Sequence, residues 1–190
     1  MASGGNVCSK KLGSCQLSAR PGNNYQLTTM KRENYEFSFE VYDSFDELSA
    51  DDAWLLREAQ RVTGLAYAPY SNFHVGAIAR LANGETVAGS NQENASYPVG
   101  ICAERVLLGT LSSLFPAVPI ETIAISYQSE TVESDHPIAP CGMCRQSLQE
   151  YEFRTQHPFR IILGGLAGKI YIIPSAGMLL PFSFTSDDLK

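Results

Sequence analysis

The sequence lacks the features that several classes of protein require. None of its stretches approaches the run of about 18 consecutive apolar residues that a membrane-spanning helix needs. Basic residues are scarce, because 14 lysines and arginines stand against 20 acidic residues, whereas phosphate binding needs clustered basic side chains. The five cysteines are an odd number, which argues against a secreted disulfide framework and for a reducing compartment. We therefore expect a cytoplasmic protein with no membrane span and no nucleic-acid partner.

The charge changes after the first 32 residues. That segment carries five basic residues and no acidic one, so residues 33–190 retain 9 basic and 20 acidic residues, a net charge of −11. Residues 1–30 are rich in Ser, Gly and Asn, and they show neither hydrophobic periodicity nor the apolar core of a secretory signal. We expect them to be a disordered extension that contains Cys8 and Cys15. The anionic remainder favours a small uncharged partner over nucleic acid.

Hydrophobic periodicity predicts one α/β domain. Alternating apolar residues make residues 31–48 strand-like, and residues 49–190 show no internal repeat or second domain. Ser49 is a helix-start signal, and Asn83-Gly84 predicts a hairpin between two antiparallel strands. The expected helices cover residues 51–64, 103–115 and 141–151, and the further strands cover residues 73–81, 85–92, 122–127, 159–163 and 169–173. This order indicates a mixed central sheet of about five strands with helices on its faces.

Three cysteines lie at the starts of two predicted helices. Cys102 opens one helix, and Cys141 and Cys144 open the other within Pro-Cys-Gly-Met-Cys. A helix N-terminus favours a thiolate, which is the form that binds a metal, and sulfur ligands favour Zn²⁺. The Cys-x-x-Cys pair alone could be a redox pair, half of a structural zinc site, or a pair without a function. Three ligands without a fourth, however, leave a coordination position for water, which is the catalytic arrangement.

Two charged residues beside the first cysteine can take part in this chemistry. Glu104 follows Cys102 by two residues, and a carboxylate there can take a proton from a metal-bound water and return it to a substrate. Alternatively, Glu104 complements the helix dipole. Three thiolates on Zn²⁺ carry a net charge of −1, so Arg105, and Arg145 beside Cys144, could draw charge from the sulfurs. Alternatively, both arginines are solvated surface residues.

These motifs resemble those of a known group of enzymes. Cys-x-Glu at 102–104, followed by Pro-Cys-x-x-Cys at 140–144, is similar to the signature of zinc-dependent nucleobase deaminases. More narrowly, residues 91–105 resemble the small, all-cysteine, homotetrameric cytidine deaminases, and so do residues 70–77 and 179–184. The resemblance covers the chain from about residue 50 to its end. It implies the three-layer cytidine deaminase-like α/β fold, a homotetramer, and active sites shared between subunits.

The resemblance also implies a reaction, which is the hydrolysis of cytidine and deoxycytidine to uridine and deoxyuridine with release of ammonia in pyrimidine salvage. Cys102, Cys141 and Cys144 would hold one zinc ion per chain. Hydroxide on the zinc would attack C4 of the pyrimidine, and Glu104 would protonate N3 and then help ammonia to leave. The implied substrate contacts are Phe73 on the pyrimidine, Asn91 and Glu93 on ribose hydroxyls, the peptide groups of Ala95 and Ala103 on the base edge, and Tyr97 and Phe184 reaching a neighbouring active site.

The residues themselves add two points about the substrate. Asn91 and Glu93 alternate at a predicted strand end, so both can face one pocket, although an ordinary polar strand terminus would look the same. The carboxylate of Glu93 would repel a 5′-phosphate and favours a neutral nucleoside. The polar, acidic loop at 128–139 has no assigned function.

Three other functions are compatible with parts of the pattern. A deaminase for another cytosine-bearing molecule, such as an aminoacyl-nucleoside antibiotic, would use the same zinc chemistry. A nucleic-acid-editing deaminase conflicts with the net charge of −11 over residues 33–190. A zinc-binding or redox module would use Cys141 and Cys144 but would leave Glu104 unexplained.

Overall fold

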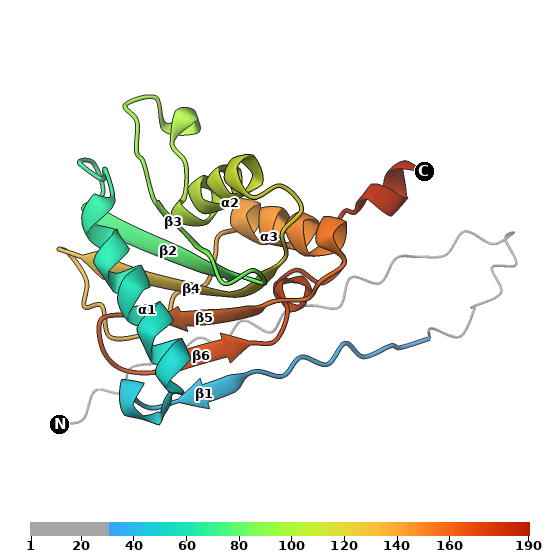
Figure 1. Cartoon of the computed structure of the whole chain (residues 1–190), viewed down its shortest axis with the longest axis horizontal. Helices are drawn as coiled ribbons and strands as arrows, with labels where there is room; N and C mark the ends of the chain where they lie inside the picture. Colours follow the sequence, from blue (N-terminus) through green and yellow to red (C-terminus); the bar gives the residue numbers. More distant parts are fainter. Residues whose placement is uncertain (1–30) are drawn as a thin grey trace, which may run out of the picture. The chain divides into compact units, whose positions relative to one another are not determined.

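The central element of the fold is a mixed six-stranded sheet. The computed structural model describes residues 31–190, of which residues 36–190 form one compact unit (Figure 1). The extension predicted for residues 1–30 lies outside the described residues. The strand order is β1-β6-β5-β4-β2-β3, and only β4 and β5 run parallel. The strands are β1 (Glu40–Tyr42), β2 (Phe73–Leu81), β3 (Thr86–Ser90), β4 (Ile120–Ser129), β5 (Arg160–Gly164) and β6 (Ile170–Ile173).

Three helices complete a three-layer arrangement. They are α1 (Ala50–Val62), α2 (Ala103–Leu114) and α3 (Gly142–Thr155). One core cluster joins α1 to one face of the sheet, and a second joins α2 and α3 to the other face (Figure 1). Successive side chains of β2 point to opposite faces of the sheet and so contribute to both clusters. Ala77 and Ala79 face α2 and α3, whereas Ile78 faces α1. None of the helices among residues 31–190 is both long enough and apolar enough to cross a membrane.

The strand count differs from the prediction of about five. The sixth strand is β1, which pairs antiparallel with β6 and places Val41 opposite Tyr171. Phe39, just before β1, adds an aromatic contact, with its ring centroid 5.0 Å from that of Tyr171. The alternating apolar pattern had indicated a strand, but such a pattern does not specify the partner strand.

Two glycines allow helices to lie directly on the sheet. A Cβ atom at Gly76 would lie 2.2 Å from the carbonyl oxygen of Ala59 in α1. On the other face, a Cβ atom at Gly89 would lie 2.4 Å from the carbonyl oxygen of Ala103, the first residue of α2. Gly89 in β3 therefore sets the height of the N-terminus of α2 above the sheet.

The loop at 128–139 packs against the turn between β5 and β6. The carbonyl oxygen of Ser134 accepts hydrogen bonds from the backbone N–H groups of Leu166, at 2.6 Å, and Ala167, at 3.3 Å. Gly165 and Gly168 permit this approach, since a Cβ atom at Gly168 would lie 1.8 Å from the carbonyl oxygen of Asp135. The loop is thus tied to the domain by backbone hydrogen bonds, and Pro140 alone separates it from Cys141.

Candidate metal centre and substrate site

The structure brings the three predicted ligand cysteines together. Cys102 is the N-cap of α2, Cys141 is the N-cap of α3, and Cys144 lies in the first turn of α3. Their sulfur atoms all lie within 4.8 Å of one another, with 3.8 Å between Cys102 and Cys141 and 3.5 Å between Cys141 and Cys144. Two helix N-termini therefore converge on one cluster of sulfurs, and their dipoles favour negative charge there.

The geometry and protonation of this cluster fit a zinc ion. Tetrahedral zinc with Zn–S bonds of about 2.3 Å places sulfurs about 3.8 Å apart, close to the separations seen. Hydrogen bonding from the Cys144 thiol lowers the pKa of Cys102 to about 6, and the same interaction raises the pKa of Cys144. Only one of these two thiols ionises readily without a cation, so three thiolates at this spacing need a positive charge between them. A soft divalent ion such as Zn²⁺ meets that need.

Glu104 lies beside the sulfur cluster in the first turn of α2, and only 5% of its surface is exposed. Burial is the main cause that raises the pKa of its carboxyl group, and the interaction with Cys144 partly offsets this rise. A raised pKa moves the carboxyl group toward the range in which it can both accept and release a proton. A glutamate that only complements a helix dipole gains nothing from such burial, which favours the functional interpretation.

The two arginines differ. Among residues 31–190, no hydrogen bond joins Arg145 to a sulfur: its Nε donates to the carbonyl oxygen of Pro140 at 2.8 Å, and its Nη1 donates to that of Leu179 at 3.2 Å. The prediction for Arg145 is therefore wrong, because these carbonyls take up its guanidinium. The positive charge of Arg105 contributes to the lowered pKa of Cys102, although no hydrogen bond to a sulfur joins it within residues 31–190. Charge compensation by Arg105 stays a prediction.

Asn91 is fixed by the first part of β2. Its Oδ1 accepts a hydrogen bond from the backbone N–H of Val75 at 2.7 Å, and its Nδ2 donates to the carbonyl oxygen of Phe73 at 2.9 Å. A side-chain amide has two donor hydrogens and two acceptor lone pairs. One of each remains for a ligand, so the side chain is both held in place and able to bind.

Glu93 is fixed by the loop that precedes β2. Its carboxylate accepts hydrogen bonds from the backbone N–H groups of Tyr70, at 2.9 Å, and Ser71, at 3.3 Å, and from the Ser71 hydroxyl at 2.5 Å. The hydroxyl bond is the main cause that lowers the pKa of Glu93. Asn91 and Glu93 are thus held by adjacent parts of the chain, residues 70–71 and the start of β2, and their facing of one pocket stays a prediction.

The backbone connects these residues to the cysteines. Gln92, which lies between Asn91 and Glu93, exchanges two backbone hydrogen bonds of 2.9 Å with Ile101, the residue before Cys102. Phe73 begins β2 on the face that carries α2 and α3, and its ring stacks on that of Tyr127 with centroids 5.1 Å apart. The base-contacting and metal-binding candidates therefore belong to one region of the molecule.

The remaining predicted contacts differ in exposure. Ala103 is fully buried, whereas Ala95 is exposed, as are Tyr97, with 77% of its surface accessible, and Phe184, with 58%. The carbonyl oxygen of Phe184 accepts a hydrogen bond from Nε2 of Gln146 at 2.8 Å, which ties the C-terminal segment to α3. The reach of Tyr97 and Phe184 into a neighbouring subunit stays a prediction.

Sequence reasoning missed two residues at this site. Ser71 holds Glu93, and Tyr127 stacks on Phe73. Tyr127 had appeared as the last apolar residue of a predicted strand, which is also what a core residue looks like. For Ser71 the position next to Tyr70 in a motif shared with the deaminases was the one available signal.

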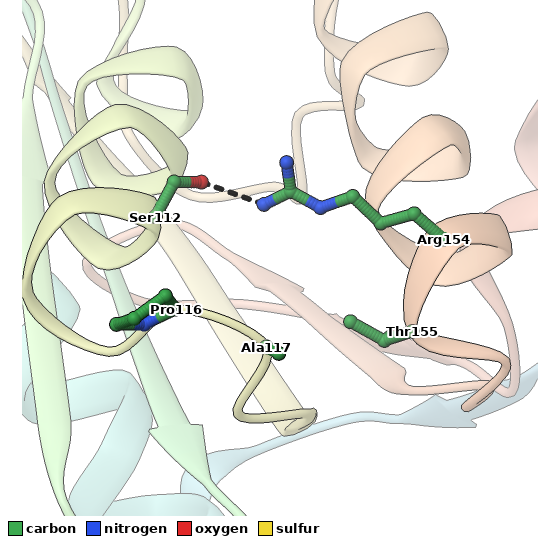
Figure 2. A pocket seen from close by; sticks show the side chains of 5 residues that line it. All are labelled: Ser112, Pro116, Ala117, Arg154 and Thr155. Carbon is green, nitrogen blue, oxygen red and sulfur yellow. Dashed lines mark hydrogen bonds between the residues drawn. The ribbon is translucent and has the colours of Figure 1, made fainter.

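A cavity elsewhere has none of these features. It has a volume of about 430 Å³ and lies at the C-terminal ends of α2 and α3 (Figure 2). The cysteines lie at the opposite, N-terminal ends of these helices. Arg154 crosses it and donates a hydrogen bond of 2.6 Å to the Ser112 hydroxyl. Pro116, Ala117 and Thr155 complete the lining, so the cavity contains no cysteine or acidic side chain.

Known proteins show the same domain. The family described as the cytidine and deoxycytidylate deaminase zinc-binding region matches residues 49–157, which include all three cysteines. A cytidine deaminase of Halalkalibacterium halodurans is 35% identical over 140 residues, which cover 74% of this chain and 98% of that protein. The crystal structure of cytidine deaminase from Burkholderia pseudomallei has a TM-score of 0.61 at 34% identity, covering 72% of this chain and 100% of that chain.

A second solved structure agrees. The crystal structure of cytidine deaminase from Mycobacterium tuberculosis has a TM-score of 0.56 at 31% identity and covers 72% of this chain and 98% of that chain. Together with the sulfur cluster, these matches define a class, the zinc-dependent hydrolytic deaminases. Within that class, the chain belongs to the cytidine deaminase family. The fold and the cofactor predicted from the sequence are thereby confirmed.

Proposed function

We propose that this protein deaminates cytidine and deoxycytidine to uridine and deoxyuridine, with release of ammonia, as a step of pyrimidine salvage in the cytoplasm. The observation that carries the proposal is the convergence of Cys102, Cys141 and Cys144 with the buried carboxyl group of Glu104 at two helix N-termini. The relatives named cytidine deaminase support the choice of substrate.

The three cysteines hold one zinc ion per chain. Zinc in such a site supplies a water molecule that is acidic enough to lose a proton near neutral pH. Glu104 carries a proton to ring atom N3 of the pyrimidine and then a proton to the departing amino group. Its raised pKa supports both steps, because the group must be protonated and deprotonated in turn. Arg105 offsets part of the negative charge of the thiolates.

The substrate contacts follow from the hydrogen bonds already made. Asn91 offers its remaining N–H and lone pair to a ribose hydroxyl, and Glu93 accepts a hydrogen bond from another. The lowered pKa keeps Glu93 anionic at neutral pH, which disfavours a substrate with a 5′-phosphate. Phe73 packs on the pyrimidine, the peptide groups of Ala95 and Ala103 contact the base edge, and Tyr97 and Phe184 act on a neighbouring site in a homotetramer.

Ultraviolet absorbance of the purified protein tests the proposal with four substrates in parallel: cytidine, deoxycytidine, CMP and a cytosine-containing oligonucleotide. We expect turnover of both nucleosides, little turnover of CMP because of Glu93, and none of the oligonucleotide. One zinc ion per chain should be found by metal analysis. A zinc-loaded protein that turns over neither nucleoside would refute the proposal.

Two matched variants separate the proton-transfer role from metal binding. Glu104→Gln should retain zinc and lose turnover, because the amide cannot carry the proton. Glu150→Gln makes the same change at an exposed position on α3 and should leave both zinc content and turnover unchanged. Loss of zinc in Glu104→Gln would instead identify Glu104 as a ligand.

A further inference from the structure

Phe73 and Tyr127 form a stacked pair beneath the proposed substrate site. Their ring centroids lie 5.1 Å apart with an angle of 18° between the planes. The antiparallel register places Tyr127 opposite Val75 and Phe73 opposite Ser129, so the two rings are diagonal neighbours on the face that carries α2 and α3. Tyr127 is fully buried, whereas Phe73 is only partly buried and keeps an accessible surface.

The hydroxyl group of Tyr127 is held by the 128–139 loop. It donates a hydrogen bond to the carbonyl oxygen of Glu133 at 3.2 Å, and it lies 3.2 Å from Nδ1 of His136. The imidazole in turn lies 3.0 Å from the carboxylate of Asp135. Ser134 anchors this loop to the β5–β6 turn. The Tyr127 side chain is therefore held at its backbone end by β4 and at its hydroxyl end by the anchored loop.

We propose that Tyr127 is a positioning residue that sets the plane of the Phe73 ring against which the pyrimidine packs. The inference rests on the proposed function, in which Phe73 contacts the base. A ring at the start of a strand keeps rotational freedom that a ligand must remove on binding, and a rigid stacking partner removes it beforehand. The 128–139 loop, which has no role in the chemistry itself, thereby acts on substrate affinity through Tyr127.

Steady-state kinetics with cytidine tests the inference, using the zinc-loaded protein and the variants Tyr127→Leu and Tyr127→Phe. Loss of one immobilised aromatic contact corresponds to a change in affinity of about 2- to 12-fold. We expect Tyr127→Leu to raise KM within that range and to change kcat by less than about twofold, because packing on the base is the same in the ground and transition states. Tyr127→Phe keeps the stacked ring but loses the hydrogen bonds of the hydroxyl group to the 128–139 loop. Its KM should therefore lie between those of the wild-type protein and Tyr127→Leu.

Two further variants separate positioning from a general loss of structure. Tyr151→Phe removes a buried tyrosine hydroxyl that donates a 2.7 Å hydrogen bond to the carbonyl oxygen of Val118, and it should lower thermal stability without raising KM. In a Phe73→Leu background, Tyr127→Leu should have little further effect on KM, since the residue through which it acts is gone.

The outcomes are distinct. No cytidine turnover by the zinc-loaded wild-type protein would overturn the proposed function and the inference with it. Normal wild-type turnover with an unchanged KM in Tyr127→Leu would overturn the inference alone, and so would an equal rise of KM in the Phe73→Leu background. Should Tyr127→Leu fail to fold, an unchanged KM in Tyr127→Phe would overturn it. KM does not depend on the fraction of active protein, so partial unfolding cannot produce the expected result.

Discussion

Gly89 should control the geometry of the candidate metal centre, although it has no side chain with which to contact the cysteines or a substrate. A methyl group at this position would lie 2.4 Å from the carbonyl oxygen of Ala103 and 2.5 Å from the backbone nitrogen of Leu107. Ordinary van der Waals contact begins at 3.4 Å, so Gly89→Ala must move β3 and the first turns of α2 apart by about 1 Å. Zinc sites tolerate about 0.2 Å in ligand distances, and Cys102 caps this helix.

We therefore expect Gly89→Ala to weaken both folding and zinc binding. Overpacking of this kind costs about 1–3 kcal/mol of the free energy of unfolding. Mutation of a group that orients a metal ligand typically lowers metal affinity by about 10- to 100-fold, and we expect an effect of that size when Cys102, the N-cap of α2, moves. Urea denaturation measures the first quantity, and competition with a chromogenic zinc chelator measures the second.

Two glycine variants are matched controls. Gly76→Ala creates a similar clash, 2.2 Å from the carbonyl oxygen of Ala59, but beneath α1 on the other face of the sheet. It should lower stability and spare zinc affinity. At Gly109, on the exposed side of α2, an added Cβ atom would meet no neighbouring atom within 4 Å, so Gly109→Ala should raise stability by about 1 kcal/mol. Equal zinc affinity in Gly89→Ala and the wild-type protein would refute the reasoning.

Three further predictions concern the site and its support. Ser71→Ala removes the main hydrogen bond of Glu93, so the pKa of Glu93 should rise. We therefore expect a higher KM for cytidine and an acidic limb of the pH profile of kcat/KM that moves to higher pH. An unshifted acidic limb would contradict this reasoning. Removal of zinc with a chelator should abolish turnover and lower the melting temperature, and added zinc should restore both. Glu152→Ala should cost about 2–4 kcal/mol in urea denaturation with zinc affinity retained, because its carboxylate accepts hydrogen bonds from Ser175, Ala176, Gly177 and Phe159.

Local signals in the sequence were enough to locate the helices that carry the metal centre. Cys102 and Cys141 were expected at helix starts, and they are the N-caps of α2 and α3. The Asn-Gly hairpin likewise fixed the pairing of β2 with β3. These features depend on residues close together in the chain, where side-chain chemistry and turn geometry determine the structure.

Features that depend on distant partners were harder to predict. The pairing of β1 with β6 joins segments about 130 residues apart, and the residues of one strand do not indicate which strand will pair with it. Arg145 comes directly after the predicted ligand Cys144, which suggested that it interacts with the sulfurs. Its guanidinium instead donates hydrogen bonds to the carbonyl groups of Pro140 and Leu179, which are not adjacent to it in the sequence. The stack of Tyr127 on Phe73 was hidden because both residues also fit the pattern of an ordinary core.

Because the three cysteines lie at the starts of two different helices, a zinc ion bound to them would act as a cross-link in the chain. Cys102 and Cys141 are 39 residues apart, so an ion bound to both closes a loop of that length. By the loop-entropy relation used for disulfides, such a closure lowers the conformational entropy of an unfolded chain that retains the ion. At 25 °C this raises the free energy of that unfolded chain by up to about 4 kcal/mol. A chain that keeps its zinc while unfolding would therefore return to the native state from a smaller ensemble than one that has lost it.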